Sequence, residues 1–181
     1  MKALASAVLA AAALAAAPAH AEAARGPRVE AKIGYDSTSV GFFGWSISRS
    51  GFTYGGEIGY DLPVSKNVSL GADAEVTGVT TEYHNAQYTL KFGRDLYAGG
   101  RITLSAARNV NLYAKVGYAN ARSIETLGPL RASGNGDGVR AGVGAQYLFN
   151  RNVYASVEYR YSNFQDNVSR NQVLTGLGYR F

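Results

Sequence analysis

The amino-acid sequence predicts an all-β fold: a closed, antiparallel, eight-stranded transmembrane β-barrel whose strands follow an up-and-down meander. Three observations lead to this prediction. Apolar and polar residues alternate through residues 171–181 up to a terminal aromatic residue, Phe181, which is the period of a half-buried strand. A triplet Lys/Arg-Asn-Val recurs at Lys66, Arg108 and Arg151, at intervals of 42 and 43 residues. The apolar face of every predicted strand lacks charged residues.

The first 21 residues predict a secretory signal peptide. Lys2 precedes an apolar stretch at 3–17, and the small residues Ala19 and Ala21 flank a position typical of signal peptidase sites. The apolar stretch is shorter than the roughly 20 residues that a membrane-spanning helix needs. We therefore expect cleavage after Ala21, which leaves residues 22–181 as a single barrel domain.

The composition of residues 22–181 excludes several classes of function. The sequence has no cysteine, which excludes a lipid-anchored lipoprotein and any disulfide or thiolate chemistry. Of its 18 Lys and Arg residues one is Lys2, so 17 remain against 13 Asp and Glu. A basic chain can bind nucleic acid, but an exported chain does not meet any. The sequence therefore predicts no nucleic-acid partner.

Each Lys/Arg-Asn-Val triplet is expected to close a β-hairpin. Alternating segments run toward and away from every triplet, while Asn suits a tight turn and the preceding cation can stay in water. Three hairpins give six strands, and one further strand lies at each end of the domain. The predicted strands are 28–36, 54–62, 68–77, 95–104, 110–118, 138–148, 153–161 and 171–181.

The connections between these strands fall into two classes. Turns of about five residues alternate with longer polar segments. Barrels of the bacterial outer membrane have short turns on the periplasmic rim and long loops outside. The sequence therefore predicts a protein of the cell outer membrane with four long extracellular loops, at 37–53, 78–94, 119–137 and 162–170.

The orientation of the two faces separates a membrane barrel from a soluble one. A soluble lipocalin-type barrel would turn the apolar face inward with the same period. The tyrosines of the apolar face, however, cluster at strand ends, with Tyr54 toward the long loops and Tyr60 toward the short turns. Two such aromatic girdles are typical of membrane interfaces. We therefore expect the apolar face to point outward, toward lipid.

With these features, the chain resembles the small outer-membrane β-barrel proteins of Gram-negative bacteria. This group includes outer-membrane proteins A and X, the opacity-type surface antigens and related porin-family barrels. The resemblance covers essentially all of residues 22–181. In this family a closing strand that ends in Phe is read by the barrel-assembly machinery, which the resemblance makes a partner of this chain. The implied assembly signal consists of Val173, Leu177, Tyr179 and Phe181.

The inward face carries charges of both signs. An eight-stranded barrel is just wide enough for side chains to fill, and buried charges must be paired. We therefore expect a salt-bridge and hydrogen-bond core; the alternative is a narrow ion path or gate. The core is predicted to contain Glu30, Lys32, Glu57, Asp73, Glu75, Arg101, Lys115, Arg140, Glu158 and Arg160. The same face also carries Asp36, Asp61, Asp95 and Arg180.

The sequence offers little support for an enzyme. Barrels of this size include lipid-modifying enzymes, which need a Ser nucleophile beside a His base. His84 is the only histidine after residue 21 and has no serine among its near neighbours, so we expect a solvated loop residue. The sequence predicts no catalytic residue, no cofactor and no metal site. A lipid-modifying enzyme is the least favoured class.

The first long segment contains three large aromatic residues, Phe42, Phe43 and Trp45, among glycines and serines. They either pack on one another above the bilayer or form an exposed contact surface. The sequence thus predicts a structural, surface-exposed envelope protein that acts in adhesion or surface interaction through its loops. Its expected partners are outer-membrane lipid, lipopolysaccharide and a host or envelope surface ligand. The alternative function is a low-conductance, porin-like channel for small solutes.

Overall fold

The computed structural model of the protein describes residues 22–42, 45–80, 82–85, 88–127, 130–165 and 168–181. The expected signal peptide lies outside these residues. No helix in the described ranges is long and apolar enough to cross a membrane. The strands are β1 (Gly26–Phe42), β2 (Trp45–Pro63), β3 (Val68–Val79), β4 (Glu82–Asn85), β5 (Tyr88–Ala107), β6 (Val110–Leu127), β7 (Leu130–Leu148), β8 (Val153–Phe164) and β9 (Val168–Arg180).

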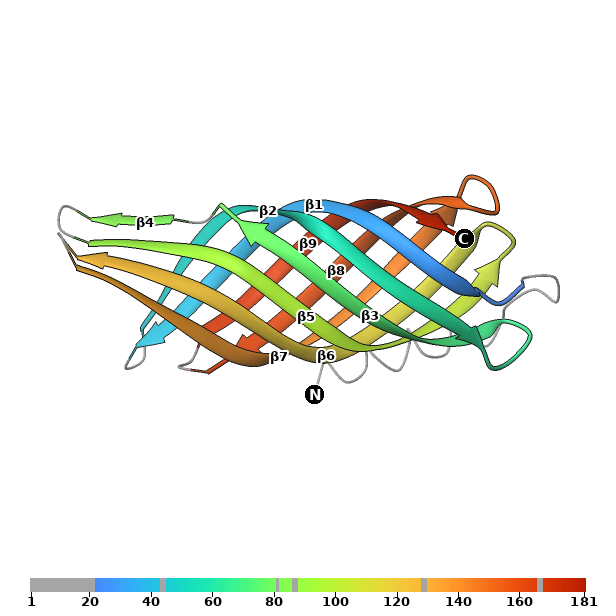
Figure 1. Ribbon diagram of the computed structural model, residues 1–181, viewed down its shortest axis with the longest axis horizontal. Helices are drawn as coiled ribbons and strands as arrows, with labels where there is room; N and C mark the ends of the chain where they lie inside the picture. Colours follow the sequence, from blue (N-terminus) through green and yellow to red (C-terminus); the bar gives the residue numbers. More distant parts are fainter. Residues whose placement is uncertain (1–21, 43–44, 81, 86–87, 128–129, 166–167) are drawn as a thin grey trace.

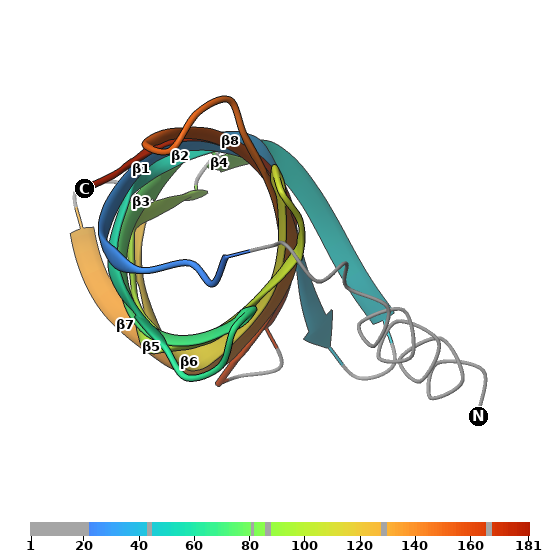
Figure 2. The same cartoon turned by 90° about the vertical axis from the view of Figure 1, so that its right-hand side faces the viewer.

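Eight of these strands form a closed antiparallel barrel (Figures 1 and 2). Neighbours in sequence are neighbours in the sheet, β1 pairs with β9, and β3 pairs with β5. The short strand β4 lies beside β5 alone, where it prolongs the line of β3. Every barrel strand is thus paired on both sides, so the backbone can cross lipid without exposed polar groups. The predicted fold class is confirmed.

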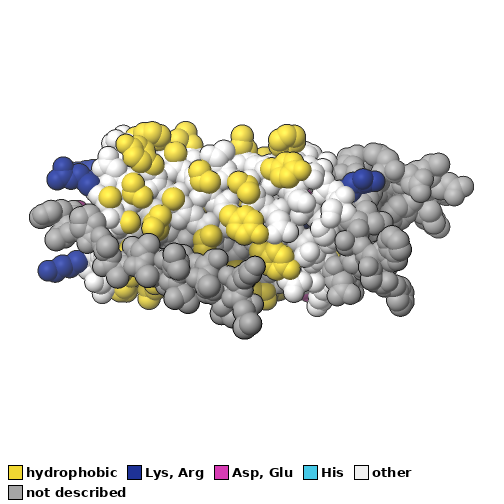
Figure 3. All heavy atoms as spheres, turned by 180° about the vertical axis from the view of Figure 1, so that it is seen from behind, with side chains coloured by type: hydrophobic (Ala, Val, Ile, Leu, Met, Phe, Trp, Pro, Cys, Tyr) yellow, Lys and Arg dark blue, Asp and Glu magenta, His cyan; other side chains and the backbone are white. Residues whose placement is uncertain are grey.

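The two faces of the barrel differ in polarity as predicted. Apolar residues point outward, and Ile33, Ile58 and Leu177 expose 63%, 61% and 60% of their surface. Charged residues point inward, and Glu57 and Arg140 expose 2% and 0%. Hydrophobic side chains are spread over the visible outer surface between the two ends (Figure 3). An apolar outer surface of this extent is stable in hydrocarbon and costly in water.

Aromatic side chains lie on the outer surface near both ends of the barrel. At the end with the short turns, Tyr147 packs edge-on against Phe149 with ring centroids 5.6 Å apart, and Tyr179 packs against Phe181 at 5.0 Å. Rings with a polar edge suit the boundary between hydrocarbon and water. The exposed tyrosines toward the other end are Tyr35, Tyr54, Tyr118, Tyr159 and Tyr161.

The predicted long loops are wrong in extent, because most of their residues belong to strands. The β1–β2 hairpin stays paired up to Phe42 and Trp45, and β6 and β7 stay paired up to Leu127 and Leu130. The segments between strands are therefore short at this end of the barrel, where the β1–β2 and β6–β7 hairpins close and which we call the hairpin end. At the opposite, short-turn end, the connections are 64–67, 108–109 and 149–152.

The reason for this difference is the surroundings of the strands. Inside the bilayer, one face must be apolar and the other polar, which imposes an alternating sequence. Beyond the bilayer both faces meet water, so pairing continues without that pattern. Backbone hydrogen bonds and polar contacts, such as that between the hydroxyls of Ser39 and Ser48 at 2.8 Å, hold the hairpin together instead.

Inward-facing glycines make room for buried tyrosine rings, which leads to a prediction. A Cβ atom at Gly178 would overlap the ring of Tyr154, whereas a Cβ atom at the outward-facing Gly100 would have no neighbour closer than 4.0 Å. We expect Gly178→Ala to lower the free energy of unfolding by about 1–3 kcal/mol, the usual range for overpacking. Gly100→Ala should be nearly silent in the same urea titration in detergent. Equal effects would contradict the close approach of Gly178 and Tyr154.

Candidate functional site

The barrel interior is the first candidate site, since it holds most of the charged residues predicted from the sequence. Among the described residues, eight buried cations face eight buried anions. The interior is therefore electrically balanced, which is the condition under which charges can be kept away from water. The cations are Arg28, Lys32, Arg101, Lys115, Arg140, Arg160, Arg170 and Arg180, and the anions are Glu30, Asp36, Glu57, Asp61, Asp73, Glu75, Asp95 and Glu158.

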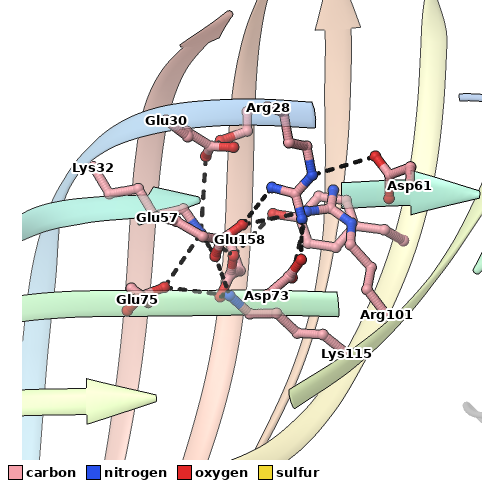
Figure 4. A network of polar contacts seen from close by, with 12 residues as sticks. Arg28, Glu30, Lys32, Glu57, Asp61, Asp73, Glu75, Arg101, Lys115 and Glu158 are labelled. Carbon is pink, nitrogen blue, oxygen red and sulfur yellow. Dashed lines mark hydrogen bonds and ion pairs between the residues drawn. The ribbon is translucent and has the colours of Figure 1, made fainter. Parts of the chain in front are cut away.

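Two lysines and three glutamates form the centre of this interior network (Figure 4). The Nζ atom of Lys32 lies 2.6 Å from Glu57, 2.8 Å from Glu158 and 3.4 Å from Glu75. The Nζ atom of Lys115 lies 2.8, 2.9 and 3.3 Å from the same three carboxylates. The five residues come from β1, β2, β3, β6 and β8. The cluster thus ties together strands from different sides of the barrel.

At the short-turn end, the network continues through two arginines. Arg28 contacts Glu57 at 2.5 Å and Asp61 at 3.3 Å, and it also donates to Asp73. Asp61 in turn lies 2.7 Å from Nη1 of Arg180. Charge-assisted contacts of this kind are the strongest hydrogen bonds in proteins. They link the first and last barrel strands, which supports closure of the sheet.

At the hairpin end, a second group of charges completes the network. Asp95 accepts from Arg140 at 2.5 Å and from Arg170 at 2.8 Å. Arg170 also lies 3.4 Å from Asp36, and Arg140 lies 3.6 Å from the central Glu75. Ion pairs therefore follow one another from one end of the barrel interior to the other.

Buried tyrosines fill the space between the charged groups. Tyr154 donates to Glu30 at 2.9 Å, and Tyr113 donates to Glu158 at 2.9 Å. The guanidinium of Arg101 lies over the ring of Tyr113, 3.6 Å from its centroid. Such contacts help to hold the buried cations and carboxylates in place. The interior therefore has the composition of a packed polar core.

The structure places the ten predicted network residues in the buried interior, together with two residues that the sequence prediction omitted, Arg28 and Arg170. Arg28 shares the inward face with Glu30 and stands at the start of the predicted strand, so its parity alone would have identified it. Arg170 precedes the predicted strand 171–181, whereas β9 begins at Val168. Arg170 lies two positions before the buried Gln172, so an earlier start of the predicted strand would have placed Arg170 on the inward face as well.

The other predicted site residues lie on the outside or at the tips. Of the four residues of the expected assembly signal, Val173, Leu177 and Tyr179 are exposed on the outer face of β9, and Phe181, which directly follows β9, is exposed as well. Phe42 and Trp45 are backbone partners at the end of the β1–β2 hairpin, and Phe43 lies outside the described residues. His84 belongs to β4, opposite Thr89 of β5, and not to an irregular loop as predicted.

Comparison with known proteins identifies the family. The model of the outer membrane protein beta-barrel domain matches residues 6–181. The chain belongs to this family. Its location is therefore the outer membrane, where the short turns of such barrels face the periplasm and the hairpin end faces outward. A comparison with curated protein sequences found no match.

Solved structures of other outer-membrane barrels share the fold. Neisserial surface protein A (NspA) has a TM-score of 0.67 and 18% identity, with 86% of this chain and 97% of that chain covered. The attachment invasion locus protein Ail of Yersinia pestis has a TM-score of 0.63 and 18% identity, with 86% and 99% covered. The N-terminal barrel of Pseudomonas aeruginosa OprF has a TM-score of 0.53 and 16% identity, with 83% and 97% covered.

The assembly signal implied by the closing strand leads to a second prediction. Phe181 is exposed to lipid, so its side chain contributes at most about 1.5–3 kcal/mol to stability. We expect Phe181→Ala to leave transport into the periplasm intact while lowering the ratio of outer-membrane to periplasmic protein in fractionated cells. The matched control is Phe149→Ala, because Phe149 is another exposed phenylalanine at the same end. If both variants lower the ratio equally, Phe181 acts through stability and not as a signal.

Proposed function

We propose that this outer-membrane barrel is a non-enzymatic surface protein that makes adhesive contacts through its extracellular hairpins. The observation that carries the proposal is the length of those hairpins. Pairing in β1–β2 and in β6–β7 continues well beyond the outward-facing tyrosines Tyr35 and Tyr118, as far as Phe42 and Leu127. A barrel that served only to fill the membrane would not need paired strands outside it.

Paired strands favour recognition because they hold side chains in place. A ligand that binds a flexible loop must order it, which lowers affinity, whereas a hydrogen-bonded hairpin is ordered beforehand. The tip of the β1–β2 hairpin carries Phe42 and Trp45, and large aromatic residues are enriched at binding hot spots. Three exposed arginines, Arg49 of β2, Arg94 of β5 and Arg122 of β6, lie toward the same end of the barrel. This combination suits an anionic surface such as a glycan or lipopolysaccharide.

Ail has been solved in complex with the heparin analogue sucrose octasulfate. Because Ail shares only 17% identity with this chain in that structure, the similarity suggests a ligand to test but does not indicate which residues would bind it. Sulfated glycan is therefore the first ligand to test, followed by lipopolysaccharide and host-cell surfaces.

The paired interior supports a surface role over the alternative of a low-conductance pore. Ion pairs and tyrosine rings occupy the described interior from end to end, and a permeating ion would have to break them. We expect no stepwise conductance from the purified protein in a planar lipid bilayer. Discrete channel openings that persist after purification would favour the pore instead.

The test of the surface role compares two variants on living cells. Phe42→Ser combined with Trp45→Ser alters the hairpin tip, and Phe149→Ser alters an exposed phenylalanine at the periplasmic end. With equal amounts of protein at the cell surface, we expect the tip variant to bind immobilised heparin and host cells at least about tenfold less, a loss of roughly 1.4 kcal/mol. Binding equal to that of the Phe149→Ser control on every surface would refute the proposal.

A further inference from the structure

The periplasmic end of the barrel carries one cation at each of its four junctions. Lys66, Arg108 and Arg151 stand in the three short turns, and Arg25 precedes β1. All four are exposed, and Lys and Arg side chains project from this end in Figure 3. The repeated triplet of the sequence thus places positive charge around the periplasmic mouth. Neither adhesion nor membrane packing accounts for this arrangement.

The chain before β1 crosses the mouth of the barrel, as Figure 2 shows. The backbone N–H of Ala23 donates to the carbonyl of Lys66 at 2.9 Å, and the hydroxyl of Ser69 donates to the carbonyl of Ala24. Ala23 and Ala24 each expose only 7% of their surface. This segment therefore forms a wall over part of the mouth and is not a loose tail.

A cavity of about 660 Å³ lies between this wall and two of the turns. Its lining includes Arg25, Arg108 and Arg151 from the rim, Arg180 from β9, Asn111, and one acidic residue, Glu22. Lys66, the cation of the third turn, is not part of the lining. We call the set Arg108, Arg151 and Arg180 the mouth site.

Arg180 is the buried member of the mouth site. It exposes 7% of its surface, and its Nη1 atom donates to Asp61 at 2.7 Å and to the carbonyl of Arg25 at 3.4 Å. Its Nη2 atom is buried and has no hydrogen-bond partner within the described part of the chain. A buried guanidinium nitrogen without an acceptor is costly. Arg180 also lines the cavity, so an oxyanion there would supply the missing acceptor once the guanidinium turns toward it.

The charges around the cavity also favour an anion. Arg108 and Arg151 form no ion pair with any carboxylate in the described ranges, whereas Glu22 is taken by Arg25 at 3.4 Å in an exposed pair. Arg108, Arg151 and Arg180 thus line one cavity, whose acidic residue Glu22 pairs with Arg25. Guanidinium groups present forked donors that match the oxygens of phosphate and carboxylate.

We propose that the mouth site binds an oxyanion on the periplasmic side, with a phosphate or carboxylate group seated against Arg180 and held by Arg108 and Arg151. The anion can belong to a free periplasmic solute or to the headgroup of an anionic phospholipid, because both present the same chemistry. The site is separate from the extracellular hairpins and does not depend on their function.

The test uses protein purified from outer membranes of cells that express the full chain, placed in nanodiscs of zwitterionic lipid. Inorganic phosphate and citrate are titrated by calorimetry and by ¹⁵N signals of arginine side chains. We expect saturable binding that shifts the Arg180 signal. The variant with Arg108→Gln and Arg151→Gln should bind at least about tenfold more weakly, which corresponds to the loss of a charge-assisted hydrogen bond. The matched control is Lys66→Gln, which removes a rim cation outside the cavity and should bind normally.

A second arm distinguishes the two sources of the anion. Nanodiscs with phosphatidylglycerol replace the free anions, and a shift of the Arg180 signal in these discs alone would assign the site to a lipid headgroup. An equal loss in Lys66→Gln and in the double variant would overturn the proposal, because it would mean attraction by general charge. An unshifted Arg180 signal with all three probes would overturn it as well. Since both variants change only exposed turn residues, circular dichroism in the same discs checks that the barrel is intact.

Discussion

Replacing Glu57 by alanine is expected to lower the free energy of unfolding in detergent by about 3–5 kcal/mol, the usual cost of removing one partner from a buried ion pair. Glu57 is 2% exposed and stands where the central cluster meets the periplasmic part of the network. Its loss would leave eight buried cations against seven anions. The affected cations are Arg28 at 2.5 Å, Lys32 at 2.6 Å, Lys115 at 2.8 Å and Arg101 at 3.4 Å.

The size of this effect depends on burial, which the controls test. Glu22→Ala removes an acidic residue whose pair with Arg25 is exposed, and exposed pairs contribute about 0–1 kcal/mol. Adding Lys115→Ala to Glu57→Ala restores the charge balance, so the double variant should lose less stability than the sum of the two single variants. Urea titrations of all four proteins measure these differences. A loss with Glu57→Ala no larger than that with Glu22→Ala would mean that water reaches the interior and screens its charges.

The parts of the fold that the sequence predicts are those that the bilayer constrains. In β7, Val139, Val143 and Tyr147 alternate with Arg140, Gly142, Gly144 and Gln146 because lipid lies on one side and the charged interior on the other. That alternation identifies the segment as a strand and shows which of its residues face lipid and which face the interior. The aromatic girdles add the position of the membrane surfaces. The architecture could therefore be obtained from a single sequence.

The hairpin extensions could not be predicted in the same way. Residues such as Ser39 and Ser48 pair across β1 and β2, yet the segment 37–53 mixes serines and glycines with scattered large apolar residues and resembles an irregular loop. Only cross-strand hydrogen bonds define the structure there, and these leave little trace in the order of residue types. The short strand β4 escaped prediction for the same reason.

The interior network was predictable in composition but not in connectivity. The alternation shows that Lys115, Glu57 and Glu158 point inward, but it does not show that they meet, because β6, which carries Lys115, pairs with neither β2 nor β8. Contacts across the interior depend on the tilt and stagger of the closed sheet. The unpaired Nη2 atom of Arg180 is likewise visible only once the segment before β1 has been placed over the mouth.

Arginine at position 143 is expected to destabilise the barrel in a lipid bilayer by about 2–4 kcal/mol, the range measured for cations at the bilayer midplane. Val143 lies halfway between Val139 and Tyr147 on the lipid-facing side of β7 and is 56% exposed in the absence of lipid. With hydrocarbon around it, a guanidinium at this depth would have to reach a distant interface or draw water and headgroups inward. The measurement is reversible denaturant unfolding in phospholipid vesicles.

The matched control for Val143→Arg is Val64→Arg in the β2–β3 turn. Val64 is 58% exposed, almost the same as Val143, but it lies at the periplasmic rim. If lipid covers the outer face, depth decides the outcome and Val64→Arg should cost only about 0–1 kcal/mol. If the exposed valines faced water, equal exposure would give equal and small effects at both positions. Equal effects at the two positions would therefore contradict a membrane-embedded outer face. A large effect of Val143→Arg alone would require that lipid covers this face.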